Sequence, residues 1–204
     1  MSPFVVLEGV DGSGKSTQAG LLVERLMADG REVVSTREPG ATPAGAAIRS
    51  IVLGGADLDP RTEALLIAAD RAEHAALVIR PALARGAVVV SDRYIPSSLA
   101  YQGVARGLGV DEIERLSRWA TGGLEADLVV VLDASVEEVA ARRDAPRDRM
   151  ERESRAFSDD VRRAYRELAA AHGWEVVDGN APVEDVAAEI WRLVQRLLAQ
   201  LPLS

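Results

Sequence analysis

Short apolar runs alternate along this chain with longer segments in which apolar residues recur every three or four positions. The runs are typical of buried strands, and the longer spacing is typical of amphipathic helices. The apolar runs predict five strands, over residues 4–8, 32–36, 87–91, 128–132 and around 175–177. The helical spacing predicts helices over residues 16–28, 43–53, 62–84, 159–172 and 183–201. We expect Pro81 to bend the third helix near its end, because proline disrupts a helix interior.

The order of these elements predicts the fold class. Strands that alternate with helices form a doubly wound α/β domain, in which helices cover a parallel sheet. The run over 87–91 is continuously apolar, as expected of a strand buried on both faces. Ser135 and Glu138 form a capping-box pattern that begins another helix. No repeat, linker or domain boundary interrupts the pattern, so we expect one domain over residues 1–204, with a charged, arginine-rich insert at about 142–155.

Composition and charge limit the cellular location and the classes of binding partner that we expect for this domain. The sequence has no cysteine, which excludes a disulfide framework and favours a cytoplasmic location. No apolar stretch approaches the ~18 residues that a membrane span needs. A formal net charge of −8 argues against nucleic acid or an anionic membrane as the main partner. A local arginine cluster can still bind a phosphorylated small molecule, because salt screens charges beyond about 8 Å.

A phosphate-binding pattern follows the first predicted strand. Residues 9–16 match G-x-x-x-x-G-K-[ST], and Lys15 within them is the only lysine of the chain. In such a loop backbone N–H groups and a helix N-terminus hold phosphates, the compact ammonium reaches between them, and the hydroxyl can ligate magnesium. The sequence therefore predicts a nucleoside triphosphate site. Its expected residues are Gly9, Val10, Asp11, Gly12, Ser13, Gly14, Lys15, Ser16 and Thr17.

Further polar residues follow the other strands. Ligands of open α/β sheets bind beyond the carboxyl ends of the strands, which is where Arg37 follows the second strand and Asp92 and Arg93 follow the third. Each arginine taken alone can be an ordinary surface residue. Several arginine-bearing segments at one sheet edge, with the insert among them, predict clamps for a second phosphate. The residues alone therefore indicate a P-loop kinase with a small phosphorylated acceptor.

Two absences narrow the chemistry. A guanine-binding N-K-x-D motif needs a second lysine, so a GTPase of the common type is disfavoured. His74 and His172 are far apart and belong to no catalytic triad or metal-ligand pattern. His74 lies near Asp70 and Arg71 on a predicted helix, where we expect a structural role.

Four segments resemble the thymidylate kinases, and the resemblance extends over essentially the whole chain. They are residues 8–17, 36–40, 68–74 and 91–103. The resemblance implies the nucleoside-monophosphate-kinase version of the P-loop fold, a five-stranded parallel sheet with helices on both faces and a short arginine-rich lid. It also implies the transfer of a phosphoryl group from ATP, with Mg²⁺, to dTMP. The implied assembly is a homodimer, with no nucleic-acid or membrane partner.

The resemblance and the charges of the reactants assign roles to the donor side. Lys15 and a Mg²⁺ ion held by Ser16 would serve the donor phosphates, with Asp92 as a further carboxylate near the metal. The adenine would rest near Asn180. The phosphate loop has no arginine, so the chain resembles the branch of the family whose lid supplies catalytic arginines; Arg147 and Arg149 are the candidates.

The resemblance also assigns residues to the acceptor, dTMP. Arg93 and Arg37 would grip the dTMP phosphate, while Asp11 would approach the sugar hydroxyl or a magnesium-bound water. The base and sugar would contact Ile67, Arg71, Ser98, Tyr101 and Gln102. Two positions depart from the family's pattern: Ile67 replaces a phenylalanine that stacks on thymine, and Ala41 replaces a glycine.

No residue is expected to act as a general base. A nucleoside monophosphate has a second pKa of about 6, so it is already a dianion at neutral pH. Two alternatives stay open at this point. The acceptor could be another pyrimidine monophosphate, such as dUMP or dCMP, or the chain could be a nucleotide-binding regulator without catalysis.

Overall fold

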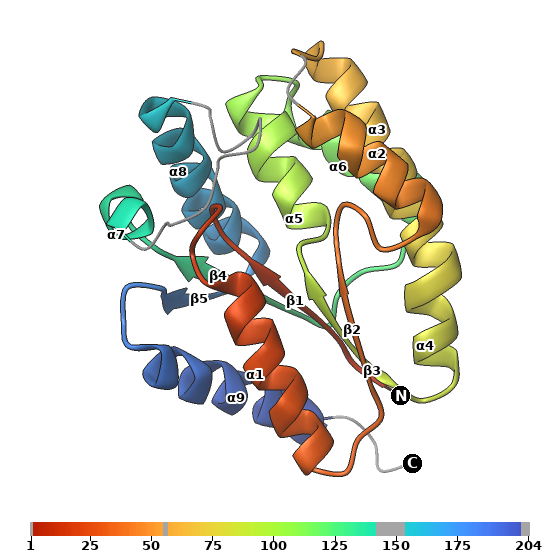
Figure 1. The fold of residues 1–204 in the computed structure, drawn as a ribbon, viewed down its shortest axis with the longest axis vertical. Helices are drawn as coiled ribbons and strands as arrows, with labels where there is room; N and C mark the ends of the chain where they lie inside the picture. The colour runs from red at the N-terminus through yellow and green to blue at the C-terminus, as the bar shows by residue number, and fades with distance from the viewer. Residues whose placement is uncertain (1, 55–56, 142–153, 201–204) are drawn as a thin grey trace.

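Five parallel strands form a single sheet in the computed structural model, which describes residues 2–54, 57–141 and 154–200. The strands are β1 (Phe4–Glu8), β2 (Val33–Arg37), β3 (Val88–Asp92), β4 (Leu128–Asp133) and β5 (Glu175–Asp178). Their order is β2-β3-β1-β4-β5, and every pair is parallel (Figure 1). The predicted fold class is therefore confirmed, and each strand lies within one residue of its predicted bounds.

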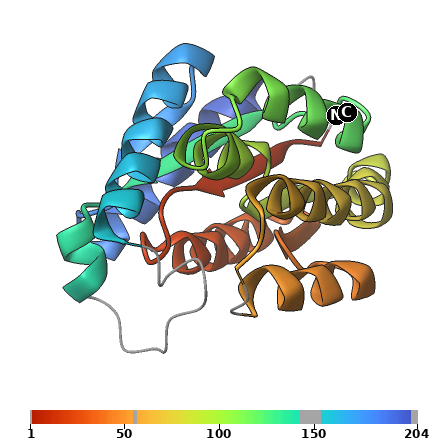
Figure 2. The same ribbon diagram turned by 90° about the horizontal axis from the view of Figure 1, so that it is seen from above.

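Helices cover both faces of the sheet (Figures 1 and 2). They are α1 (Lys15–Ala28), α2 (Pro43–Leu53), α3 (Pro60–His74), α4 (Arg80–Ala84), α5 (Ile95–Ser98), α6 (Val110–Thr121), α7 (Val136–Ala141), α8 (Arg155–His172) and α9 (Val183–Gln200). Two π-helical segments, η1 (Ala75–Ile79) and η2 (Leu99–Ala105), join α3 to α4 and follow α5. Helices α1 and α9 pack on one face, and α8 and η2 contribute to the core on the other.

Two of the predicted helices differ from the sequence prediction, and α5, η2 and α6 were not predicted. The segment over 62–84 is helical but irregular, because the wider turn η1 directly precedes Arg80 and Pro81. Proline lacks an N–H and crowds the carbonyl one turn earlier, and a π turn is one way to relieve that conflict. Helix α8 begins at Arg155, four residues before its predicted start, because the Ser154 hydroxyl caps it by accepting the Phe157 N–H at 3.1 Å.

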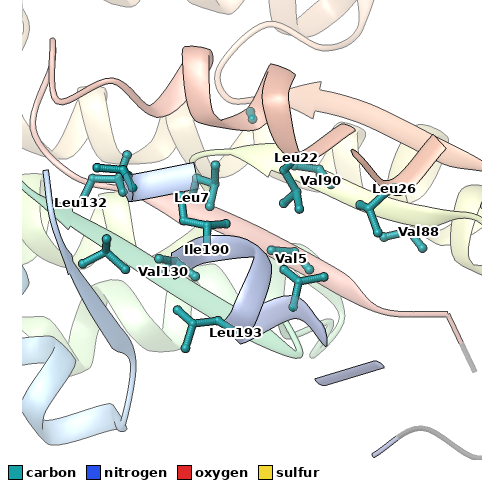
Figure 3. Close-up of a cluster of buried hydrophobic side chains, with 14 residues drawn as sticks. Val5, Leu7, Leu22, Leu26, Val88, Val90, Val130, Leu132, Ile190 and Leu193 are labelled. Atoms are coloured by element: carbon teal, nitrogen blue, oxygen red, sulfur yellow. The ribbon is translucent and has the colours of Figure 1, made fainter. Parts of the chain in front are cut away.

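The apolar core between the sheet and helices α1 and α9 fixes the central strands (Figure 3). Strand β1 is buried along its whole length, since it lies in the middle of the sheet. The labelled side chains are Val5, Leu7, Leu22, Leu26, Val88, Val90, Val130, Leu132, Ile190 and Leu193. This packing places the carboxyl ends of β1 and β3 side by side, where the phosphate loop and the residues after Asp92 begin.

None of the helices in the described part of the chain is both long and apolar enough to span a bilayer.

Candidate active site

The phosphate loop connects β1 to α1 through two glycines whose conformations exclude side chains. Gly14, the N-cap of α1, has a φ of 95°. Gly9 has a φ of 138°, and a Cβ atom there would lie 2.6 Å from the Leu132 carbonyl oxygen. Only glycine adopts these conformations without strain. The loop can therefore pass close to β4 and turn its backbone toward the N-terminus of α1.

A cavity of about 730 Å³ lies beside this loop, and we call it the large cavity. Its lining includes Asp11, Gly12, Ser13, Gly14, Lys15, Ser16, Thr17, Gln18, Arg37, Glu38, Arg49, Asp92, Arg93, Gly179, Asn180, Ala181, Pro182, Val183 and Val186. Gly9 and Val10 lie behind it, and their carbonyl oxygens accept hydrogen bonds from Arg93 and Lys15. The large cavity thus brings together most of the residues that the sequence assigns to the donor nucleotide.

Lys15 is buried in the wall of the large cavity with only 5% of its surface exposed. Its Nζ donates to the Val10 carbonyl oxygen at 2.9 Å. Burial and the neighbouring Arg93 lower the pKa of Lys15, while Asp11, Asp92 and Glu8 oppose them; the net pKa falls to about 8. The ammonium is therefore held in an unfavourable environment that bound phosphates would improve.

The residues predicted to hold magnesium are in direct contact. The Ser16 hydroxyl donates to Asp92 Oδ2 at 2.5 Å. No cluster of three or more His, Cys, Asp or Glu side chains suited to a metal occurs in residues 2–54, 57–141 and 154–200. Mg²⁺ does not require such a cluster, because it keeps several waters and usually takes one or two protein oxygens together with phosphate oxygens.

A second, smaller cavity of about 100 Å³ adjoins the first, and we call it the small cavity. It is lined by Asp11, Glu38, Pro39, Arg49, Val52, Leu53, Ile67, Arg71, Arg93, Ser97, Ser98, Tyr101 and Gln102. Four of these residues, Asp11, Glu38, Arg49 and Arg93, also line the large cavity. The small cavity contains every predicted acceptor residue except Arg37, which is exposed and lines only the large cavity.

Arg93 and Asp11 form an ion pair where the two cavities meet. The Tyr101 hydroxyl donates to the other oxygen of Asp11 at 3.2 Å, and the Arg93 guanidinium lies 5.3 Å from the centre of the Tyr101 ring. Burial alone would raise the pKa of Asp11, but Arg93 and Lys15 outweigh it and lower the pKa to about 2. Asp11 is therefore a carboxylate at neutral pH. Arg93 is the one described non-glycine residue with a positive φ, of 78°, a strained conformation of the kind that concentrates at functional sites.

Arg71 lines the small cavity and is almost completely buried. Its guanidinium donates to Glu38 Oε2 at 2.8 Å, to the Ser98 hydroxyl at 2.9 Å and to the Tyr94 carbonyl oxygen at 2.9 Å. His74 Nδ1 lies 2.8 Å from the other oxygen of Glu38. His74 thus has a structural position outside the cavity lining, and Glu38 ties α3 to the segment after β2.

Two residues that the sequence analysis did not single out also contribute to this site. Arg49 on α2 donates to the Pro39 carbonyl oxygen at 2.9 Å and lines both cavities. Asp70 on α3 accepts the Gly40 N–H at 2.9 Å and so holds the same loop. The only sequence signal for Arg49 is that it is the one charged residue of a mostly apolar helix.

The remaining predicted residues occupy the margins of the site. The Gln102 amide lines the small cavity and donates to the buried Glu63 at 2.8 Å. Asn180 lines the large cavity; its Oδ1 accepts the Ser135 N–H at 2.9 Å, which joins the ends of β4 and β5. Arg147 and Arg149 lie outside the described residues, as does the insert except for the first residues of α8.

Comparison with known proteins yields one consistent family. A family model described as Thymidylate kinase matches residues 7–190. A protein named Thymidylate kinase from Leifsonia xyli subsp. xyli is 53% identical over 192 residues, which cover 92% of this chain and 91% of that protein. Proteins of the same name from Synechococcus sp. (strain JA-3-3Ab) and Clavibacter michiganensis subsp. michiganensis are 48% and 50% identical, and the matches cover 98% and 96% of each chain.

Proposed function

Because the chain belongs to the thymidylate kinase family, we propose that it transfers the γ-phosphoryl group of ATP to dTMP, with Mg²⁺ as cofactor, and releases ADP and dTDP. The observation that carries this proposal is the junction of the two cavities at Asp11, Arg49 and Arg93. A nucleotide in the large cavity and a monophosphate in the small one would present their phosphates to the same two arginines.

The large cavity suits the donor. Lys15 and the N-terminus of α1 supply positive charge for phosphates. Ser16 and Asp92 would hold Mg²⁺, which when bound neutralises part of the phosphate charge. Asn180 holds the segment after β5, which lines the far part of the cavity and is where the adenine would rest.

The small cavity suits a pyrimidine nucleotide. Its lining includes the buried Arg71 and Ser98, polar groups that a thymine edge could meet, and the apolar Ile67. The Tyr101 ring packs beside the Arg93 guanidinium. A ring in that position would leave little room for a 2′-hydroxyl, which favours a deoxynucleotide.

The chemistry then needs positioning and charge stabilisation more than proton transfer. The acceptor phosphate is already a dianion near neutral pH, so no general base is required. Arg93 and Arg49 would hold the two anions in line and stabilise the charge that spreads over the transferred group. The roles of Arg37, Arg147 and Arg149 as further phosphate contacts stay predictions based on the family resemblance.

We also infer that the protein forms a homodimer. Leu65 and Leu77 on the α3–η1 segment are 59% and 58% exposed, and Trp119 on the adjoining helix α6 is 82% exposed. Large exposed apolar side chains on helices that contact each other favour an interface. A cytoplasmic location, expected from the lack of cysteine, stays a prediction.

A substrate panel tests the proposed function. ADP release by the purified protein is measured with ATP, Mg²⁺ and dTMP, dUMP, dCMP, UMP, CMP or AMP in turn, with Lys15→Ala as the inactive control. We expect turnover that strongly favours dTMP and is lost in the control. Preference for another monophosphate would replace the substrate but keep the mechanism. Absence of turnover with all six would favour a nucleotide-binding regulator.

A further inference from the structure

The Arg93 guanidinium is held on one side by neutral oxygen atoms. Its Nη1 group lies 3.2 Å from the Gly9 carbonyl oxygen, 3.1 Å from the Ser97 hydroxyl and 3.3 Å from the Tyr165 hydroxyl. Its Nη2 group pairs with the carboxylate of Asp11. On the Nη1 side, by contrast, the guanidinium is oriented by groups that carry no charge.

Behind the two hydroxyls lies Glu8, whose side chain is completely buried. Its Oε2 accepts from the Ser97 hydroxyl at 2.7 Å and from the Tyr165 hydroxyl at 2.8 Å. Its Oε1 accepts the backbone N–H groups of Tyr94 and Ser97 at 2.8 and 3.2 Å. Burial raises the pKa of Glu8 above its ordinary value, while Arg93 and these hydrogen bonds oppose that rise. Four donors directed at two oxygens match the pattern of an ionised carboxylate, which only accepts hydrogen bonds.

The carboxylate determines which way the two hydroxyls point. A hydroxyl has one proton, and once that proton is donated to Glu8 only lone pairs remain for other neighbours. Burial and the nearby Glu8 raise the pKa of Tyr165 well above its ordinary value, so this hydroxyl keeps its proton. Both oxygens then face Arg93 as acceptors, which is the orientation that a guanidinium needs.

We propose that Glu8, acting through the hydroxyls of Ser97 and Tyr165, is a positioning residue that orients Arg93 for the acceptor phosphate. This inference rests on the proposed function, because it assigns Arg93 to the acceptor. The three residues come from β1, from α5 and from α8, so the arrangement locks Arg93 from three separate elements. An arginine fixed before the substrate arrives loses less side-chain entropy on binding.

The first test removes one hydroxyl and compares it with a matched control. Tyr165→Phe keeps the ring and deletes one of the three acceptors of the Arg93 Nη1 group. Tyr94 is an equally buried tyrosine that enters this arrangement only through its backbone N–H, and Tyr94→Phe deletes its hydroxyl, which donates to the Leu124 carbonyl oxygen at 3.0 Å. We expect Tyr165→Phe to raise KM for dTMP on the order of 3- to 10-fold, as for loss of one oriented hydrogen bond, with KM for ATP unchanged. Tyr94→Phe should leave both KM values unchanged even where it lowers Tm.

The second test changes the carboxylate. In Glu8→Gln the amide oxygen can still accept the two backbone N–H groups, but the amide nitrogen donates toward the hydroxyls. Their protons then turn away from residue 8, toward Arg93 or, for one of them, toward the other hydroxyl 3.0 Å away. We expect Glu8→Gln to raise KM for dTMP more than Tyr165→Phe does. In a protein that already carries Tyr165→Phe, Glu8→Gln should have a smaller effect, because the effects of substitutions within one hydrogen-bond network do not add. Where Glu8→Gln does not fold, Ser97→Ala combined with Tyr165→Phe removes both hydroxyls through which Glu8 acts, and KM for dTMP should rise more than in Tyr165→Phe alone.

The outcomes separate this inference from the proposed function. If wild-type protein phosphorylates dTMP but Tyr165→Phe and Glu8→Gln behave like Tyr94→Phe, the positioning role is wrong. Effects of Glu8→Gln and Tyr165→Phe that simply add would also overturn it. If the wild type does not phosphorylate dTMP, the proposed function fails instead. Calorimetric binding of dTMP and of the other monophosphates of the panel then makes the same comparison of variants without turnover, and equal affinities in all variants would refute the inference.

Discussion

Replacing Lys15 by methionine should stabilise the protein while it abolishes activity. In the absence of nucleotide, burial and Arg93 lower the pKa of Lys15 from 10.5 to about 8. Each pKa unit corresponds to about 1.4 kcal/mol, so keeping the ammonium charged at neutral pH costs the folded state about 3 kcal/mol. Methionine keeps most of the aliphatic chain and removes the charge.

Part of this gain is offset by a lost hydrogen bond. Lys15 Nζ donates to the Val10 carbonyl oxygen, and that bond contributes about 1 kcal/mol. The carbonyl still accepts the Ser13 N–H at 3.2 Å, so it does not lose its last partner. The expected net increase in the free energy of unfolding is about 2 kcal/mol, which in a domain of this size raises Tm by roughly 5 °C.

The assay is denaturant and thermal unfolding of nucleotide-free protein, with ADP release measured in parallel. Lys15→Arg serves as the control, because it keeps a positive charge and should not gain stability. The pH dependence supplies a second check. Between pH 8 and 10.5 the unfolded chain binds more protons at Lys15 than the folded chain, so wild-type stability should rise with pH relative to Lys15→Met.

Two results would refute this reasoning. One is a Lys15→Met protein that is no more stable than the wild type at pH 7 without nucleotide. The other is a stability difference that stays constant between pH 8 and 10. Either result would mean that the charged form of Lys15 is not disfavoured in the nucleotide-free protein.

Four further predictions follow from single contacts. Ile67→Phe should tighten dTMP binding about 2- to 12-fold by adding a stacking face, measured by calorimetry; weaker binding would mean that the ring takes the space of the base. Asp70→Ala should raise KM for dTMP several-fold because Gly40 loses its acceptor, whereas Asp70→Asn, which can still accept, should stay near wild type; equal KM values would remove the role of this contact. Ser16→Ala should raise the Mg²⁺ concentration for half-maximal turnover, and an unchanged metal titration would place the ion elsewhere. Trp119→Glu should shift the sedimentation coefficient toward a monomer, and an unchanged value would exclude this face as the interface.

The sequence alone predicted the features that depend on a local motif or on the position of a residue at the end of a strand. Parallel strands present their carboxyl ends at one edge, so the juxtaposition of Ser16 with Asp92 could be expected from two separate motifs. The glycines of the phosphate loop likewise follow from the conformations that such a loop requires. The start of α8 was missed because Ser154, its cap, lies in a charged segment without helical periodicity.

Features that depend on packing between distant helices could not be predicted in this way. The contact of Glu38 with both Arg71 and His74 joins the segment after β2 to α3, and nothing in the spacing of these residues specifies it. Tyr165 is similar, because its helical position marks it as a core residue and only the packing of α8 brings its hydroxyl to Glu8. Contacts of this kind can be identified only from the tertiary structure, because side-chain hydrogen bonds leave no periodic pattern in the sequence.

The buried cations of the two cavities differ in whether a carboxylate neutralises them. This difference indicates how the binding of each ligand changes the stability of the site. On the acceptor side, the buried cations already have carboxylate partners, Arg71 with Glu38 and Arg93 with Asp11. On the donor side, the one hydrogen-bond acceptor of Lys15 within the described residues is a carbonyl oxygen, and its charge is disfavoured. Phosphates bound there would supply the missing anion, and a ligand that binds only the folded state stabilises it. The donor nucleotide should therefore relieve the strain that Lys15 imposes, whereas the acceptor must compete with Asp11 for an arginine that is already paired.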